Sequence, residues 1–334
     1  AIYGSRGANG VILITTKRGE KGDPKITYDA YYGSQSVTRQ IDLMDAQDFI
    51  AFSNEARNEA KLAPFLFWNE ADTLGAGTDW QEELFRSAPM HNHQLSVSGG
   101  GEKSNYYVSF GHMNQKGIVI NSGFKRYSVR INTDTKIGKR LKIGNSLTLS
   151  RSNTNSISSG DSHGIVASAL KKSPTIPVYT TGPDGNQVYA GPFEYEAFFT
   201  GRMGNPVRMA KEPIKASFRN KALGSVYGEV ELFEGLKYKL NLGFDYGFTN
   251  NNRFTPIYKE YPVYPNQQVL IRNTNAAAEQ SSITSSNLSA DNILTYTKTF
   301  FSSHHFSAMA GYSAQKYDNL INYSESEGHR NNQL

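Results

Sequence analysis

The sequence of 334 residues contains no cysteine. This excludes disulfide bonds, thiolate metal sites and thiol catalysis. No stretch approaches eighteen consecutive apolar residues, so no transmembrane helix is predicted. The chain begins at Ala1 without a signal-peptide pattern, and we expect any signal peptide to lie outside it. The formal net charge is only +5 with acids and bases mixed, which gives no case for nucleic-acid binding.

The abundant residues point to strands and turns. The chain has 20 tyrosines, 18 phenylalanines and 30 glycines. Aromatic residues favour strands, and glycine favours the turns between them. Membrane β-barrels carry apolar residues only at alternate positions, so their mean hydropathy resembles that of a water-soluble protein. The composition therefore leaves a barrel open.

Apolar residues alternate with polar ones along most of the chain. The clearest run has apolar side chains at Leu236, Tyr238, Leu240, Leu242, Phe244, Tyr246 and Phe248. Similar runs occur near residues 26–32, 106–111, 127–132, 141–150, 218–232, 288–296 and 306–312. This period of two predicts about nine strands, several of them about ten residues long or longer. Strands of that length are long enough to cross a bilayer at a tilt.

The connections between these strands alternate in length. Short turns are expected at residues 99–104, 138–139, 234–235 and 301–302, and long connections at 36–92, 114–123, 152–216 and 249–285. An outer-membrane barrel needs short turns at one end and long loops at the other. A Greek-key sandwich has no reason to keep that order. The long connections also contain two expected helices, one capped by Asp45 and one over residues 163–172.

No catalytic, metal or cofactor site is predicted. The segment from Gly4 to Gly10 is glycine-rich, but it lacks the Lys-Ser/Thr ending of a phosphate loop and precedes a strand. His91 and His93 share a strand face and have metal-ligand chemistry, yet polar strand-edge residues explain them better. Acids expected on the polar faces, which a carbohydrate-active enzyme would need in pairs, have no evident pairing; they are Asp29, Asp134, Glu229, Glu231 and Asp245.

Aromatic side chains in the long connections are the candidates for substrate or partner binding. They are Trp68, Trp80, Tyr179, Tyr189, Phe193 and Tyr195. Exposed aromatics there would stack on sugar rings or contact a partner protein. The alternative is that they pack the loops against one another, because long ordered loops need small cores of their own. Packing is the favoured alternative.

Residues 2–19 resemble the end of the plug domain of TonB-dependent receptors, and more narrowly the SusC/RagA family of Bacteroidetes nutrient importers. The residues of this plug-end motif are Tyr3, Gly4, Arg6, Gly7, Asn9 and Gly10. Later stretches resemble the same family in the same order. They are residues 79–85, 93–100, 105–109, 117–127, 141–145, 205–207 and 306–311.

The resemblance implies an all-β fold: the end of a plug over residues 1–22, followed over residues 23–334 by the first strands of a barrel of about twenty-two strands. It implies location in the outer membrane of a Gram-negative bacterium, in contact with lipid. It also implies a SusD-like lipoprotein partner and energy from a TonB–ExbB–ExbD complex that contacts a part outside this chain. Oligosaccharides are the expected substrates, with peptides as the second choice.

Import and adhesion are the two functions that the sequence leaves in competition. An importer explains the plug-end motif ahead of the strands and the alternation of turn and loop lengths. A surface adhesin or structural β-protein would share the aromatic strands but would have no use for a plug.

Overall fold

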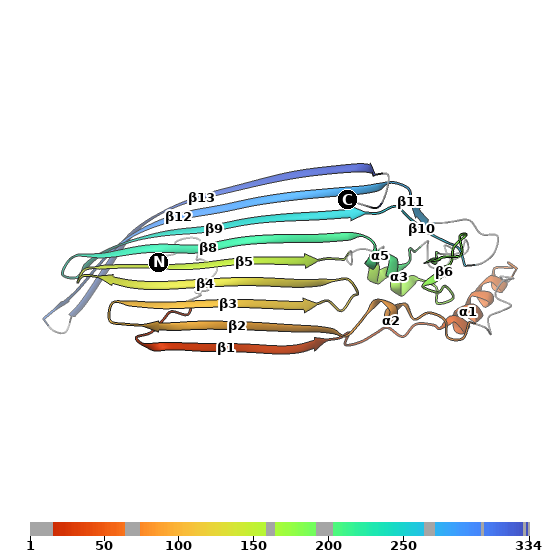
Figure 1. Cartoon of the computed structure of the whole chain (residues 1–334), viewed down its shortest axis with the longest axis horizontal. Coiled ribbons are helices and arrows are strands. Elements are labelled where there is room, and N and C mark those ends of the chain that lie inside the picture. Colours follow the sequence, from red (N-terminus) through yellow and green to blue (C-terminus); the bar gives the residue numbers. More distant parts are fainter. Residues whose placement is uncertain are drawn as a thin grey trace.

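The computed structural model describes residues 16–63, 74–157, 164–191, 203–263, 271–301, 304–329 and 332. Its main feature is a nine-stranded antiparallel sheet in which neighbouring strands follow the order of the chain (Figure 1). The strands are β1 Gly22–Gln35, β2 Ala88–Gly100, β3 Ser104–Lys116, β4 Gly123–Ile137, β5 Leu141–Asn155, β8 Ile214–Phe233, β9 Leu236–Thr255, β12 Ala276–Phe300 and β13 His304–His329. This meander confirms the all-β fold and the number of strands predicted from the sequence.

Turns lie at one end of the sheet and long connections at the other (Figure 1). Residues 101–103, 138–140 and 234–235 form turns, and Gly138 and Gly235 take the positive φ that tight turns require. The long connections cover residues 36–87, 117–122, 156–213 and 256–275. The predicted alternation is therefore present. We call the two ends of the sheet the turn end and the loop end.

The strands extend further toward the loop end than the sequence predicts. A connection was expected over residues 249–285, whereas β9 continues to Thr255 and β12 begins at Ala276. The expected connections 36–92, 114–123 and 152–216 are also shorter, because β2, β3, β5 and β8 reach into them. Residues 249–252 and 281–286 are mostly Asn, Ser and Thr on both faces, so the apolar alternation stops before the strand pairing does.

In the described parts of the long connections there are four helices and two short hairpins. The helices are α1 Ala46–Glu59, α2 Trp80–Leu84, α3 Ile165–Lys171 and α5 Pro206–Lys211, and the hairpins pair β6 Tyr179–Thr181 with β7 Gln187–Tyr189 and β10 Tyr258–Glu260 with β11 Ile271–Asn273. The Asp45 carboxylate accepts a hydrogen bond from the Asp48 amide and caps α1 as predicted. None of the helices described is long and apolar enough to cross a membrane.

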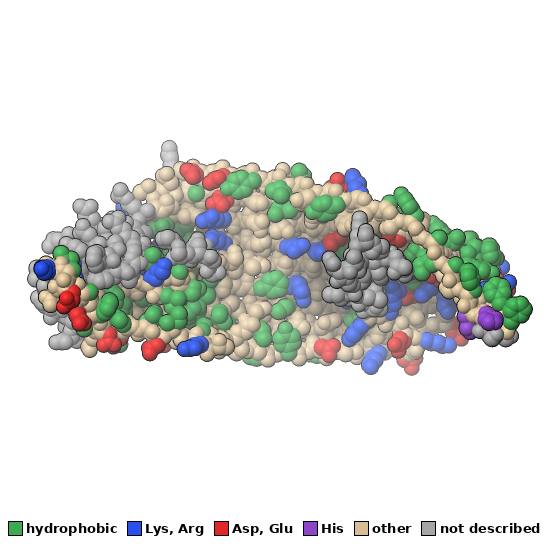
Figure 2. Space-filling view, turned by 180° about the vertical axis from the view of Figure 1, so that it is seen from behind, with side chains coloured by type: hydrophobic (Ala, Val, Ile, Leu, Met, Phe, Trp, Pro, Cys, Tyr) green, Lys and Arg blue, Asp and Glu red, His purple; other side chains and the backbone are tan. Residues whose placement is uncertain are grey.

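The two faces of the sheet differ in chemistry. Residues paired directly across antiparallel strands share a face. One such row is Tyr28, Leu95, Phe110, Val129 and Leu149. The next residues along the strands form a row on the opposite face: Ser96, Ser109, Arg130 and Thr148. We call these the apolar face and the polar face. Figure 2 shows the polar face, which is hollowed and carries charged side chains across its floor.

Large side chains on the apolar face are exposed. Ile26 is 70% exposed and Val226 is 53% exposed. A contiguous apolar surface of this extent marks contact with something other than water. A wall of a membrane barrel, with lipid on the apolar face and an aqueous interior on the polar face, satisfies both faces.

Arginine at Val226 should therefore destabilise the full-length protein in a bilayer. Val226 lies on the apolar face, midway along that face of β8, and its neighbour Ser225 lies on the polar face. We expect Val226→Arg to lower the free energy of unfolding in lipid vesicles by about 2–4 kcal/mol. Denaturant titration measures this. Ser225→Arg is the matched control, and an equal loss in both variants would contradict the assignment of the faces.

Candidate functional site

The long connections pack into one unit at the loop end, which we call the loop cap. It comprises residues 36–63, 74–87, 117–122, 164–191, 203–213 and 256–263. Its core contains side chains from all of these connections except the last: Ile50, Trp80, Leu84, Val119, Ile165, Ala169, Ile176, Val178, Ala190, Val207 and Ala210. Val263, from the last connection, packs against this core. The loop cap is therefore a small hydrophobic domain at the loop end of the nine-stranded sheet. We call this sheet the wall.

Trp80 joins the first long connection to the third. Its indole Nε1 donates a hydrogen bond of 2.9 Å to the Ser173 carbonyl, and the residue is 3% exposed. Close by, the Thr78 amide donates to the Pro174 carbonyl at 2.8 Å. A Cβ on Gly77 would lie 2.3 Å from the same carbonyl oxygen, so only glycine permits this approach.

Arg208 and Glu260 join the third connection to the fourth. The Arg208 Nε lies 2.6 Å from Glu260 Oε1, and Glu260 is fully buried. The same carboxylate oxygen accepts from the Asn205 amide at 2.8 Å. The Arg208 guanidinium also lies over the Tyr258 ring, 3.5 Å from its centroid. Since breaking a buried pair costs several kcal/mol, this contact fixes the position of α5 on β10.

A groove of 1480 Å³ opens in the loop cap. Its lining includes Trp80, Tyr179, the start of α1, and a set of carboxylates: Asp42, Asp45, Asp79, Glu82 and Glu83. Two of these carboxylates already serve the fold, because Asp45 caps α1 and Asp79 caps α2. Asp42, Glu82 and Glu83 are exposed and have acceptor oxygens for sugar hydroxyls or for the amino groups of a peptide.

The predicted binding residues do not share one environment. Trp80 is buried and has a packing role. Tyr179 lines the groove and contacts the Tyr189 ring in a tilted arrangement with 5.1 Å between ring centroids, and the Lys211 ammonium lies 6.0 Å from the Tyr179 ring. Trp68, Phe193 and Tyr195 lie outside the described residues, as do Tyr3, Gly4, Arg6, Gly7, Asn9 and Gly10 of the plug-end motif. Their roles stay predictions.

Two groups near the groove have shifted pKa values. Burial raises the pKa of Tyr189 to about 12, so its hydroxyl stays protonated at neutral pH. Burial also raises the pKa of Glu212, although the neighbouring Arg208 opposes the shift. Glu212 Oε2 lies 3.6 Å from the Arg208 Nη1, whose guanidinium is already paired with Glu260. Two carboxylates therefore compete for one cation.

A second cluster holds residues 16–20 on the polar face of the sheet. The Arg18 Nη1 contacts both carboxylate oxygens of Asp134 on β4, at 2.5 and 2.6 Å. The Tyr227 hydroxyl on β8 donates to the same carboxylate, and the Lys142 Nζ on β5 lies 3.9 Å away. The hydrogen bond to Asp134 raises the pKa of Arg18. We call this cluster the latch.

Backbone contacts complete the latch. The Asn132 side-chain amide donates to the Lys17 carbonyl at 2.6 Å. Gly19 is buried, and a Cβ there would lie 2.2 Å from the Tyr106 carbonyl oxygen. The chain thus lies directly on the wall at Gly19. The apolar–polar alternation predicts that Asp134 lies on a polar face, but no local pattern identifies Arg18, 116 positions away, as its partner.

His91 and His93 lie on the apolar face near the loop end, together with His112. Ring centroids are 5.1 Å apart for His91 and His93 and 5.4 Å apart for His91 and His112. His112 in turn stacks on Tyr127 at 4.7 Å. Within the described part of the chain, no group of three side chains has an arrangement suited to a metal ion. These histidines form an aromatic cluster with the tyrosines beside them.

Removal of the Asp134 carboxylate should release residues 16–20 from the wall. Asp134→Ala deletes the charge-assisted hydrogen bonds of the latch and leaves Arg18 unpaired. We expect the amides of residues 16–20 to exchange with deuterium about ten to a hundred times faster in the full-length protein. Asp245→Ala, which removes the 3.0 Å ion pair with Lys221 on the same face, is the control. Unchanged exchange in Asp134→Ala would contradict the latch.

The raised pKa of Glu212 predicts how the loop cap responds to pH. The folded state favours the protonated carboxyl, so the cap becomes more stable as pH falls through the raised pKa toward the ordinary value of 4.5. Deuterium exchange in α5, corrected for the intrinsic rate, should slow over that interval, and Glu212→Gln should abolish the change. As a control, Asp184→Asn should leave it intact. A wild-type cap that loosens over this interval would contradict the prediction.

No family model matches the chain. It is 31% identical over 96% of its length to TonB-dependent receptor P3 of Formosa agariphila, and 30% identical over 98% to receptor P26 of the same organism. It is 33% identical over 54% of its length to TonB-dependent receptor SusC of Bacteroides thetaiotaomicron. The chain spans 30%, 31% and 17% of these relatives, respectively.

The fold matches part of a solved structure of the RagAB peptide transporter. The TM-score is 0.78 at 23% identity, and the match covers 98% of this chain and 38% of that one. The open-open state of the RagAB peptide importer gives a TM-score of 0.77 at 22% identity, covering all of this chain and 39% of that one. The sequence matches, with a fold that agrees, identify the chain as part of a TonB-dependent receptor of the SusC type.

Proposed function

We propose that this chain forms the wall and loop cap of an outer-membrane nutrient importer. Substrate binds in the groove of the loop cap, outside the cell, and passes along the polar face after the plug moves. The relationship to TonB-dependent receptors over 96% of the chain carries this proposal. The latch supports it, because the end of a plug inside a barrel would lie against the polar face, as residues 16–20 do.

The division into a plug end over residues 1–22 and a barrel over residues 23–334 belongs to the same proposal. Arg18 and Gly19 lie before β1, which begins at Gly22, and both contact the polar face. Energy would come from a TonB–ExbB–ExbD complex that contacts another part of the full-length receptor. A SusD-like lipoprotein would cover the loop cap, where the long connections gather at one end of the wall (Figure 1).

Oligosaccharides are the proposed substrates. The groove combines an aromatic ring at Tyr179 with exposed carboxylates at Asp42, Glu82 and Glu83. Rings that stack and oxygens that accept from hydroxyls suit sugars. Cationic peptides would use the same carboxylates, so a peptide is the second candidate.

Replacement of Tyr179 by alanine tests the groove. In the full-length receptor with its lipoprotein, we expect Tyr179→Ala to weaken substrate binding about two- to tenfold through loss of the stacking surface. Calorimetric titration with oligosaccharide and peptide mixtures measures this. Tyr32→Ala, on the apolar face of β1, is the matched control. Equal affinity in both variants would remove Tyr179 from the site, and uptake that persists without TonB would contradict TonB-driven import.

A further inference from the structure

Charged side chains are distributed unequally between the two faces of the sheet. In β2, β3, β4, β5, β8 and β9, the strand pairing places every acid on the polar face: Asp134, Glu229, Glu231 and Asp245. In these six strands the charged side chains on the apolar face are Lys116, Lys125 and Arg151. All are cations, and all lie in the half of their strands nearest the loop end. Over these six strands the apolar face therefore has a cationic border with no acid on the same face.

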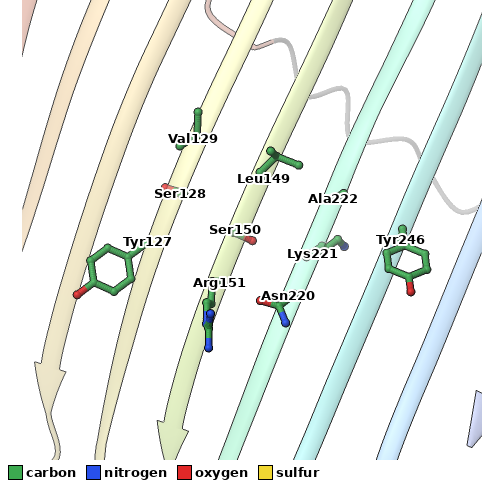
Figure 3. A pocket seen from close by; sticks show the side chains of 10 residues that line it. All are labelled: Tyr127, Ser128, Val129, Leu149, Ser150, Arg151, Asn220, Lys221, Ala222 and Tyr246. Atoms are coloured by element: carbon green, nitrogen blue, oxygen red, sulfur yellow. The ribbon is translucent and has the colours of Figure 1, made fainter.

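A depression of 380 Å³ lies on the apolar face next to this border, on its side toward the turn end. Tyr127 on β4 and Tyr246 on β9 form its two sides, and Val129, Leu149 and Ala222 form its floor (Figure 3). It exists because Ala222 is small, whereas the tyrosines on either side are large. On the apolar face its lining is apolar apart from Arg151 and Asn220, and both tyrosines are about half exposed.

The side at Tyr127 is held in place. His112 on the neighbouring strand β3 stacks on the Tyr127 ring with 4.7 Å between centroids and 24° between planes. Arg151 lies directly opposite Tyr127 across the β4–β5 pair, and Asn220 lies opposite Arg151. Arg151 is two residues beyond Leu149, about 7 Å nearer the loop end. A ligand in the depression would thus contact apolar groups along most of its length and the Arg151 guanidinium at the end nearest the loop end.

We propose that this depression binds a membrane lipid that carries a phosphate and acyl chains. One acyl chain lies between Tyr127 and Tyr246 on the floor at Leu149 and Ala222. The phosphate contacts Arg151 and Lys125, which form no ion pair among the residues that the structure describes. The inference rests on the proposed location in the outer membrane, since only then does the apolar face meet lipid.

Charge complementarity favours a lipid over a second copy of the chain. Basic residues at the level of the head groups attract anionic lipid by about 1 kcal/mol each, which is about fivefold in occupancy. A symmetric dimer centred on the depression would instead bring Arg151 and Lys125 close to the same residues of the other copy. No acid on the apolar face of the adjoining strands would offset that repulsion.

Native mass spectrometry of the full-length receptor tests the site. The probes are phosphatidylglycerol and phosphatidylcholine with identical acyl chains, each supplied in nanodiscs. We expect the wild type to retain phosphatidylglycerol preferentially. Arg151→Gln with Lys125→Gln should lower that retention about 25-fold, at fivefold for each cation. Ala222→Trp, which fills the depression, should lower retention of both lipids.

Arg126→Gln is the matched control, because it removes a cation from the same strand on the opposite face. It should leave lipid retention unchanged. Equal retention of the two lipids by the wild type would overturn the proposal. So would a double variant that keeps its preference, or a dimer whose formation Ala222→Trp abolishes. TonB-dependent uptake by the double variant separates this result from the proposed transport function, since the depression lies outside the groove and the latch.

Discussion

The register of the strand pairing is the constraint on which the other features depend. Eight neighbouring pairs align so that every second residue falls on one face, and a shift of one residue would exchange the two faces. In lipid the strands must also stay paired, because an unpaired backbone N–H or C=O group has no water to which it can hydrogen-bond. The same register brings Asp134, Gly144 and Tyr227 into one row on the polar face, where Asp134 and Tyr227 meet Arg18.

The loop cap follows a different principle from the wall. The wall keeps its large apolar side chains on the outside, whereas the cap encloses its own around Trp80, Leu84 and Ile176. Buried polar contacts then connect the separate connections, as between Arg208 and Glu260. A groove in such a cap has walls from several connections, so a displacement of one connection changes its shape. That coupling would suit the proposed role of the groove, in which substrate is bound and then released.

The latch and the loop cap lie toward opposite ends of the wall. The contacts that hold residues 16–20 in the latch are weaker than those that hold the loop cap together. The latch uses one carboxylate, one guanidinium and close backbone contact at Gly19. Arg18 is 40% exposed, so its ion pair is screened by salt and can open at moderate cost. The Arg208–Glu260 pair is enclosed and far costlier to separate. The proposed movement of a plug would need this order of strengths, with residues 16–20 released while the loop cap stays in place.

The sequence by itself determined the all-β class, the number of strands, the alternation of turns and loops, and the capped helix at Asp45. Each depends on residues close together in the chain, such as the alternation from Leu236 to Phe248. It did not locate the ends of β9 and β12, because residues 249–252 and 281–286 lack an apolar face. Only the tertiary structure decided that Arg18 meets Asp134, that Trp80 is buried in the core of the loop cap, and that Ala222 leaves a depression. These are contacts between residues far apart in the chain, and their partners are set by strand order and register, which no local pattern encodes.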